Sequence, residues 1–418
     1  MNHFFIAMRS IDRVQGDFVP KKLHRNIPML YGLAFFQCFM VIVPVVVPFF
    51  ASKGLSLAEI FYLQAVFATT IVLLEAPSGY FADILGRRSA LLIGSIVFGC
   101  GYFLLNFADD FFSLMLFEIA LGVAFSLLSG ADLALLYDTQ KALEAEENSE
   151  HSNSIAHLGV TKCIAEALGA LLGGALALYS FELMVLIQSA AAWMCLVLAV
   201  FIVEPPYRRS ETVADRVRIG EILRHLFSSD PILRQIIIAI PLYSLATFNV
   251  IWLIQPYWEA QGLSLAVFGV LWCLQSLTAA FATRYGFALE RRLGAAGALA
   301  IIGVLPIVSQ IGMAWFPGWA GIAIALLLFV GRGLKQVILV NALNRRVPSE
   351  FRATANSFTS FLFRLSFIVS GPVIGYIAEI HGTSMALQLL GICYVIVFAV
   401  VMLPLIQSVK SLQQRVAA

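Results

Sequence analysis

Twelve apolar segments follow one another along this chain, and each is long enough to cross a lipid bilayer. A helix needs about 20 apolar residues to span roughly 30 Å of hydrocarbon. The chain is 60% hydrophobic and 12% charged, whereas soluble domains carry about 25% charged residues. Because backbone groups in lipid must be satisfied within the protein, the sequence predicts an all-α polytopic membrane protein. The predicted spans are residues 28–51, 57–82, 89–108, 111–137, 155–179, 183–203, 232–257, 265–288, 295–315, 319–343, 354–379 and 384–406.

The basic residues predict how these spans are oriented. With the N-terminus inside, the inner tails and loops hold 21 of the 27 lysines and arginines, and the outer loops hold Lys53 alone. This asymmetry predicts that both termini are cytoplasmic, in a multi-pass protein of the plasma membrane, here a bacterial inner membrane. The first 26 residues show no signal-peptide pattern, so we expect the first span to direct insertion. A net charge of +2 gives no basis for a nucleic-acid partner.

A repeated pattern predicts two similar halves. The sequence GLSLA occurs at 54–58 and again at 262–266, and the same offset places Pro48 on Pro256. A register that holds at matching topological positions indicates duplication, and two parallel six-helix halves are typical of transporters. The predicted layout is a cytoplasmic tail (1–26), an N-terminal half (27–203), a central cytoplasmic loop with an amphipathic helix (204–231), a C-terminal half (232–406) and a cytoplasmic tail (407–418).

The loop between the second and third spans carries a recognisable motif. Its sequence, GYFADILGRR at 79–88, resembles the loop motif of the major facilitator superfamily, G-x-x-x-D-(R/K)-x-G-R-(R/K). Ile84 stands where the family has a basic residue. The resemblance implies a fold of twelve helices in two pseudo-symmetric halves and transport by alternating access. It also implies a gating role at the cytoplasmic ends of the two halves for Gly79, Asp83, Gly86, Arg87 and Arg88.

Elementary chemistry is consistent with a gating role for this motif. Gly79 allows a close helix approach, and Arg87 can pair with Asp83. A degenerate counterpart in the second half, Glu290 and Arg291 followed by Gly294, predicts a similar bracing role. The alternative interpretation is a loop that only satisfies the charge asymmetry of the membrane.

One departure from the family leaves the transporter subclass open. Many antiporters of the superfamily have R-x-x-x-G in the fourth span, where this chain has Glu118 followed four residues later by Gly122. A carboxylate therefore stands where an arginine is expected. Membership of the drug/proton antiporters is not implied.

Charged residues inside the spans are the candidate transport residues. Each costs on the order of 2.5 to 3.5 kcal/mol to insert, so each needs a partner, a cavity or a function. The functional hypothesis is a positive path that attracts an organic anion, with carboxylates that titrate to couple protons. The alternative is that the cations pair with acids to hold helices together, for example Lys162 with Glu166 or Arg284 with Glu75. The predicted path residues are Lys162, Arg332, Lys335, Arg364, Asn249, Gln275 and Trp252, and the predicted coupling residues are Glu75, Glu118 and Glu166.

The sequence thus predicts a secondary active transporter. It shows no Walker loop, metalloprotease motif or nucleophile motif, so we predict neither an enzyme nor a cofactor or metal. The expected partners are a small organic solute, with an anion or carboxylate as first choice, and protons or another coupling ion. The protein is expected to act as a monomer. Proton-coupled efflux of amphiphilic drugs is the alternative. A receptor or scaffold on the same fold is a third class, but the chain lacks the long extramembrane domain such a protein usually has.

Overall fold

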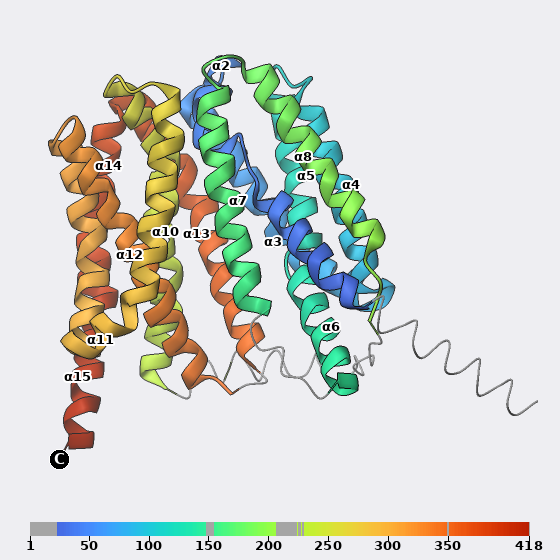
Figure 1. Ribbon diagram of the computed structural model, residues 1–418. Coiled ribbons are helices and arrows are strands. Elements are labelled where there is room, and N and C mark those ends of the chain that lie inside the picture. Colours follow the sequence, from blue (N-terminus) through green and yellow to red (C-terminus); the bar gives the residue numbers. More distant parts are fainter. Residues whose placement is uncertain are drawn as a thin grey trace, which may run out of the picture. The chain divides into compact units, whose positions relative to one another are not determined.

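The computed structural model describes residues 23–147, 154–205, 224, 227, 230–348 and 351–417, and the elements in these ranges are helices (Figure 1). Residues 23–38 are helical. They are followed by η1 (Val43–Val45), α2 (Val46–Ser52), α3 (Leu57–Leu85), α4 (Arg87–Leu105), α5 (Phe111–Leu128), α6 (Ala131–Glu147), α7 (Ser154–Leu176), α8 (Phe181–Phe201), α10 (Pro231–Ala260), α11 (Leu265–Trp315), α12 (Trp319–Arg346), α13 (Arg352–His381), α14 (Thr383–Val397), η3 (Phe398–Met402) and α15 (Leu403–Ala417).

The helices reproduce the predicted number of membrane crossings. Among the described residues, 11 helical stretches are long and apolar enough to span a membrane. The longest, α11, has 51 residues and would be about 77 Å long as one helix, more than two bilayer thicknesses. It is two helices joined at Gly294, whose φ of 73° and ψ of 164° are not helical. Counted as two spans, α11 brings the total to the predicted twelve.

The chain forms two compact units. One consists of Met1–Val43 and Leu73–Ser210, and the other of Pro44–Val72 and Glu211–Ala418. The boundaries therefore fall inside the first span and inside α3, and residues 44–72 belong to the second unit. The duplication of two six-helix halves remains a prediction.

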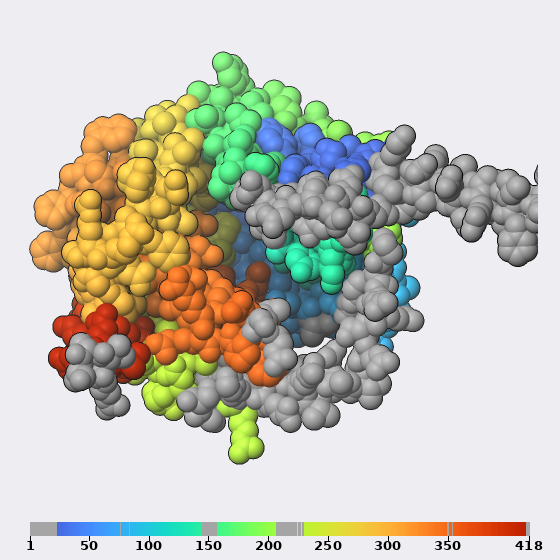
Figure 2. Space-filling model, turned by 60° about the horizontal axis from the view of Figure 1, so that its bottom comes forward, coloured from blue at the N-terminus to red at the C-terminus, as the bar shows by residue number. Residues whose placement is uncertain are grey.

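Close helix packing defines the interior of each unit. In the first, α4 packs against α5 and α8, and a Cβ at Gly99 would lie 2.7 Å from the Trp193 ring. In the second, α10, α11, α12 and α14 lie side by side (Figure 1), and a Cβ at Gly375 would lie 2.7 Å from Phe61. The C-terminal helix α15 (red) lies beside α11 (yellow) in Figure 2. Small residues allow these helices to approach closely in lipid.

The first span departs from the prediction. A continuous helix over 28–51 is wrong, because the helix ends at residue 38 and resumes only with η1 and α2. Pro44 explains part of the break, since it supplies no N–H group to a helical ladder. The freed backbone is satisfied by glutamines: the Val41 N–H donates to Gln188 Oε1 at 2.6 Å, and the Val47 N–H donates to Gln255 Oε1 at 2.9 Å. Irregular backbone at membrane depth needs such internal partners.

The fourth span is also interrupted. The prediction of one helix over 111–137 is wrong at Ser129 and Gly130, which separate α5 from α6. Gly130 has a φ of 88°, a left-handed conformation that glycine adopts without steric cost. The turn places Asp132 in the first turn of α6.

Two predicted segments fall largely outside the described residues. These are most of the N-terminal tail (1–26) and most of the central loop (204–231), including its predicted amphipathic helix. Glu204 and Asp230, at the two ends of that loop, are described and contribute to the sites below.

Candidate functional site

The loop motif in the first unit is held by a carboxylate that the prediction did not include. Gly86 separates α3 from α4 with a φ of 92°, and Arg87 begins α4. The Glu204 carboxylate accepts the backbone N–H of Arg87 at 2.9 Å and of Arg88 at 2.7 Å. Because the first N–H groups of a helix lack internal partners and favour negative charge, Glu204 caps α4 from outside the motif. Its place at the inner end of the sixth span was the only sequence signal.

The Arg87 side chain joins the motif to α6. Its guanidinium pairs with the Asp138 carboxylate and donates to the Ala134 carbonyl oxygen at 2.8 Å. Both groups of the ion pair are largely shielded from solvent, where a charge-assisted hydrogen bond is stronger than at an open surface. The predicted partner, Asp83, has a side chain outside the described residues. The sequence places Asp138 in the cytoplasmic third of the fourth span, where gate or loop contacts are expected, but motif reasoning did not predict its pairing with Arg87.

The other predicted gating residues are less constrained. Gly79 is exposed, and a Cβ at this position would meet no described atom of its own unit within 4 Å. The close helix approach expected at Gly79 is therefore not present within the first unit. In the second unit, Arg291 is exposed and Glu290 lines a cavity. The gating role of all these residues remains a prediction.

A polar cluster in the first unit is centred on Lys162. Its Nζ lies 2.9 Å from Asp132 Oδ2, and the Asp132 side chain is only 6% exposed. This ion pair links α7 to α6, whereas the predicted pair with Glu166 would have stayed within α7. Lys162, Asp132 and Glu166 all lie near enough to Cys38, at the end of the helical stretch 23–38, to act on it electrostatically. The cluster therefore adjoins the break in the first span.

Two glutamines beside this break have polar atoms available for a ligand. Gln37 and Gln188 are buried, and Gln37 Oε1 and Gln188 Nε2 have no hydrogen-bond partner among the described residues. An unpaired buried polar group costs about 1 to 3 kcal/mol, so a bound solute or water would be stabilised here.

The strongest candidate site in the second unit is a buried lysine. Lys335 is 8% exposed, and its Nζ lies 2.6 Å from Ser244 Oγ. Both residues are near the middle of their helices, α12 and α10. No carboxylate pairs with Lys335 in the described part of the chain. A cation is therefore held at membrane depth by a neutral hydroxyl, an arrangement that an anionic ligand would complete.

Aromatic side chains follow Ser244, the partner of this lysine, along α10. Phe248 follows Ser244 by one turn of α10, and its ring centroid is 5.1 Å from Phe363 and 4.6 Å from Phe367. Trp252, one turn further along, is 6.2 Å from Phe248. The Trp252 Nε1 and Asn249 Oδ1 atoms have no hydrogen-bond partner among the described residues. The cluster combines a cation, an apolar wall and two polar atoms.

The remaining predicted path residues differ in burial. Gln275 is buried in α11, whereas Arg332 is exposed one turn before Lys335. Arg364 directly follows Phe363 in α13. Among the predicted coupling carboxylates, Glu118 is 4% exposed, Glu75 is half-buried and Glu166 is exposed.

The family model of the Major Facilitator Superfamily matches residues 29–371. The chain belongs to the major facilitator superfamily. It is therefore a multi-pass membrane protein and a secondary transporter of a small molecule, and it is not an enzyme.

Solved structures of other superfamily members share its fold. A mutant of the nucleoside transporter NupG has a TM-score of 0.76 at 13% identity, over 91% of this chain and 99% of that chain. A bacterial homologue of the human lysosomal transporter Spinster has a TM-score of 0.71 at 16% identity, over 94% and 97%. A D-xylose–proton symporter has a TM-score of 0.65 at 15% identity, over 91% and 97%. At these identities the likeness shows the fold alone. No curated protein matches the sequence significantly.

Proposed function

We propose that this superfamily transporter moves a small organic anion, a carboxylate with an apolar or aromatic body, by alternating access. The observation that carries the proposal is the buried ammonium of Lys335, which contacts Ser244 and no described carboxylate. A lysine at membrane depth costs on the order of 2.5 to 3.5 kcal/mol. Binding a carboxylate would offset that cost, because a charge-assisted hydrogen bond replaces a neutral one.

The neighbouring side chains support an apolar body for the solute. Phe248 and Trp252 follow Ser244 by one and two turns of α10, and the Phe363 ring on α13 packs against Phe248, so the three rings form an aromatic wall. Ligand sites commonly combine such walls with a few polar groups that fix orientation. Asn249 and Trp252 supply an acceptor and a donor for that purpose.

A thermal-shift screen of the purified transporter tests this substrate class. Benzoate is expected to raise the unfolding temperature in a concentration-dependent way, since a ligand of the folded state stabilises it. Inorganic phosphate and tetraphenylphosphonium serve as a polar anion and a lipophilic cation. Stabilisation by the cation and not by benzoate would overturn the proposal.

Efflux of amphiphilic cationic drugs is the second candidate. The same aromatic wall favours it, because aromatic faces attract cations. Lys335 argues against it, since a buried ammonium that contacts Ser244, one turn from Phe248, repels a cationic solute. A tetraphenylphosphonium shift would favour this candidate.

Proton coupling is proposed to depend on a buried carboxylate, and Glu118 is the most buried of the three predicted coupling residues. We expect Glu118→Gln to abolish the response of benzoate uptake to a pH gradient in proteoliposomes. Passive exchange of benzoate across the same vesicles should persist, because exchange needs no net proton movement. Glu75→Gln and Glu166→Gln are the matched changes in more exposed carboxylates. A pH response that survives in all three variants would exclude these residues from coupling.

The remaining predictions about the cellular setting stay part of the proposal. Both termini are proposed to face the cytoplasm of a bacterial plasma membrane, and the transporter is proposed to act as a monomer. The distribution of basic residues over the predicted loops supports the orientation.

A further inference from the structure

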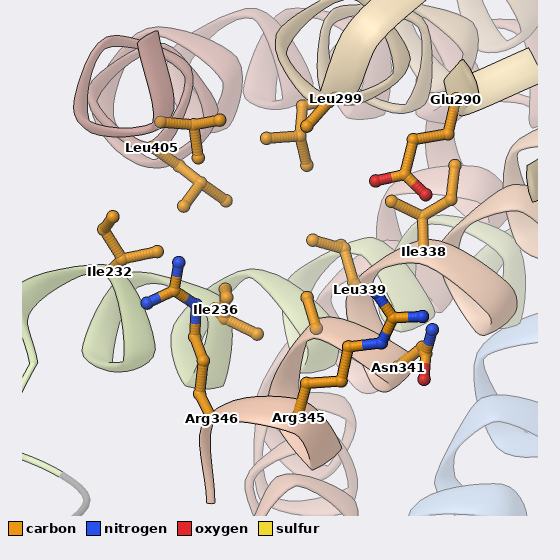
Figure 3. A pocket seen from close by; sticks show the side chains of 13 residues that line it. Ile232, Ile236, Glu290, Leu299, Ile338, Leu339, Asn341, Arg345, Arg346 and Leu405 are labelled. Atoms are coloured by element: carbon orange, nitrogen blue, oxygen red, sulfur yellow. The ribbon is translucent and has the colours of Figure 1, made fainter. Parts of the chain in front are cut away.

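A cavity of about 290 Å³ lies in the second unit, and its lining on α12 begins at Ile338, one helical turn after Lys335. Its apolar lining comes from four helices, with Ile232 on α10, Leu299 on α11, Leu339 on α12 and Leu405 on α15. Figure 3 shows these side chains around an open space, with charged side chains at its edge. The volume is at the lower end of the roughly 300 to 1,000 Å³ typical of ligand sites.

The cavity lies at the ends of membrane helices. Ile232 is in the first turn of α10, Arg346 is the last residue of α12, and Ala295 directly follows the Gly294 joint of α11. Helix ends that carry arginines lie at the boundary between hydrocarbon and water, where side chains meet lipid headgroups. The apolar lining therefore lies on the hydrocarbon side and the charged edge on the water side of this boundary, like the acyl chains and the headgroup of a phospholipid.

The edge of the cavity carries one ion pair and two further charged side chains that do not pair with each other. Arg346 pairs with Asp230, so that arginine is already neutralised. Arg345 and Glu290 both line the cavity, and neither forms an ion pair within the described part of the chain. In Figure 3, Arg345 rises from the end of α12 while Glu290 descends from α11 above Ile338. One positive and one negative group thus face one space without contacting each other.

We propose that this cavity binds the headgroup of a membrane phospholipid that carries both a phosphate and a primary amine. The phosphate contacts the Arg345 guanidinium, whose planar donors suit phosphate oxygens. The ammonium donates to the Glu290 carboxylate. The proximal parts of the acyl chains lie against the apolar lining side chains, such as Leu405 and Val409.

The charge balance selects this headgroup over others. A headgroup with phosphate but no amine would leave Glu290 desolvated beside a second negative charge. A quaternary ammonium has no N–H to donate to that carboxylate. The structure therefore predicts a preference for phosphatidylethanolamine over phosphatidylglycerol and phosphatidylcholine.

Lipid binding to the purified full-length transporter tests the proposal. Detergent-solubilised protein is titrated with each of the three dioleoyl phospholipids, and bound lipid is counted by native mass spectrometry. Phosphatidylethanolamine should bind roughly tenfold tighter than the other two, the effect of one charge-assisted hydrogen bond. Equal binding of the three lipids to the unaltered protein would overturn the proposal. So would equally strong binding of soluble phosphoethanolamine, since the ligand would then be a free headgroup.

Two variants test which side chain contacts the amine and which contacts the phosphate of the headgroup. Glu290→Gln should remove the preference over phosphatidylcholine, and Arg345→Gln should weaken all three lipids roughly tenfold. Arg292→Gln and Glu259→Gln are the matched controls, because both positions are exposed and neither lines the cavity. A preference that survives Glu290→Gln, or is lost equally in the controls, contradicts the assignment. None of these measurements depends on which solute is transported.

Discussion

Lys335→Gln is expected to lower benzoate uptake into proteoliposomes by about 10- to 100-fold. The physical reason is the loss of a charge-assisted hydrogen bond to the solute, worth about 1.5 to 3 kcal/mol, from a site where the lysine donates to Ser244 and pairs with no carboxylate of the described residues. The unfolding temperature of the variant is expected to stay equal or to rise. A buried cation that no described carboxylate pairs with costs free energy in the unliganded protein, and the amide removes that cost.

Two further variants distinguish the effect of a positive charge at this site from an effect of the protein's net charge. Lys335→Arg keeps the cation and should retain part of the uptake, because the guanidinium still attracts a carboxylate. Lys410→Gln removes an exposed cation on α15 and should leave uptake unchanged. If Lys335→Gln transports normally, the anion site is not at this lysine. If Lys410→Gln loses as much uptake as Lys335→Gln, the effect is one of net charge.

Gly333→Ala is expected to lower the stability of the protein. A Cβ at this position would overlap the Ala279 carbonyl oxygen and lie 2.8 Å from the Ala282 Cβ, both on α11. The Thr283 hydroxyl also donates to the Gly333 carbonyl oxygen at 3.3 Å across the same contact. Overpacking typically costs about 1 to 3 kcal/mol, and carbonyl groups of a helix cannot rotate away as a side chain can. The variant should unfold at a lower temperature.

The same substitution also tests how Lys335 is positioned. Gly333 lies two residues before Lys335, so pushing α12 away from α11 displaces the ammonium, and benzoate uptake should fall together with stability. Gly159→Ala is the matched control in α7, since a Cβ there meets no described atom within 4 Å. Alanine is the better helix former by about 1 kcal/mol, so the control should be neutral or stabilising. Equal unfolding temperatures for the two variants would show that the contact at Gly333 is not tight.

The comparison of motif and structure shows what a local pattern can predict. The pattern at 79–88 identified the superfamily and the place where α3 turns into α4, because Gly86 and the following arginines are adjacent in sequence. It did not predict Glu204 or Asp138 as partners of Arg87. Those residues lie 117 and 51 positions away. Sequence spacing carries no information about which distant helix ends meet.

The intramembrane charges show the same limit. Spacing suggested that Lys162 pairs with Glu166 four residues away, since such pairs share a helix face. The structure places Asp132 against Lys162, because the turn at Gly130 brings the start of α6 to α7. In the sequence Arg332 is the favoured path residue, because no acid lies near it on its own helix, whereas Lys335 could instead reach toward the cytoplasmic interface. Helix packing reverses that order, since Arg332 is exposed and Lys335 is buried.

The sequence by itself determined that this chain spans a membrane about twelve times and belongs among superfamily transporters. Hydrophobicity over about 20 residues and a ten-residue motif are local properties, and the bilayer forces each apolar segment into a helix. The tertiary structure alone decided where helices break and which polar groups meet. The break after residue 38 is stabilised by Gln188 and Gln255 from other helices, which accept the N–H groups of Val41 and Val47 on its two sides. The Lys335 ammonium donates a hydrogen bond to Ser244, which lies on a different helix. Such partners depend on the packing of distant segments, which no local pattern encodes.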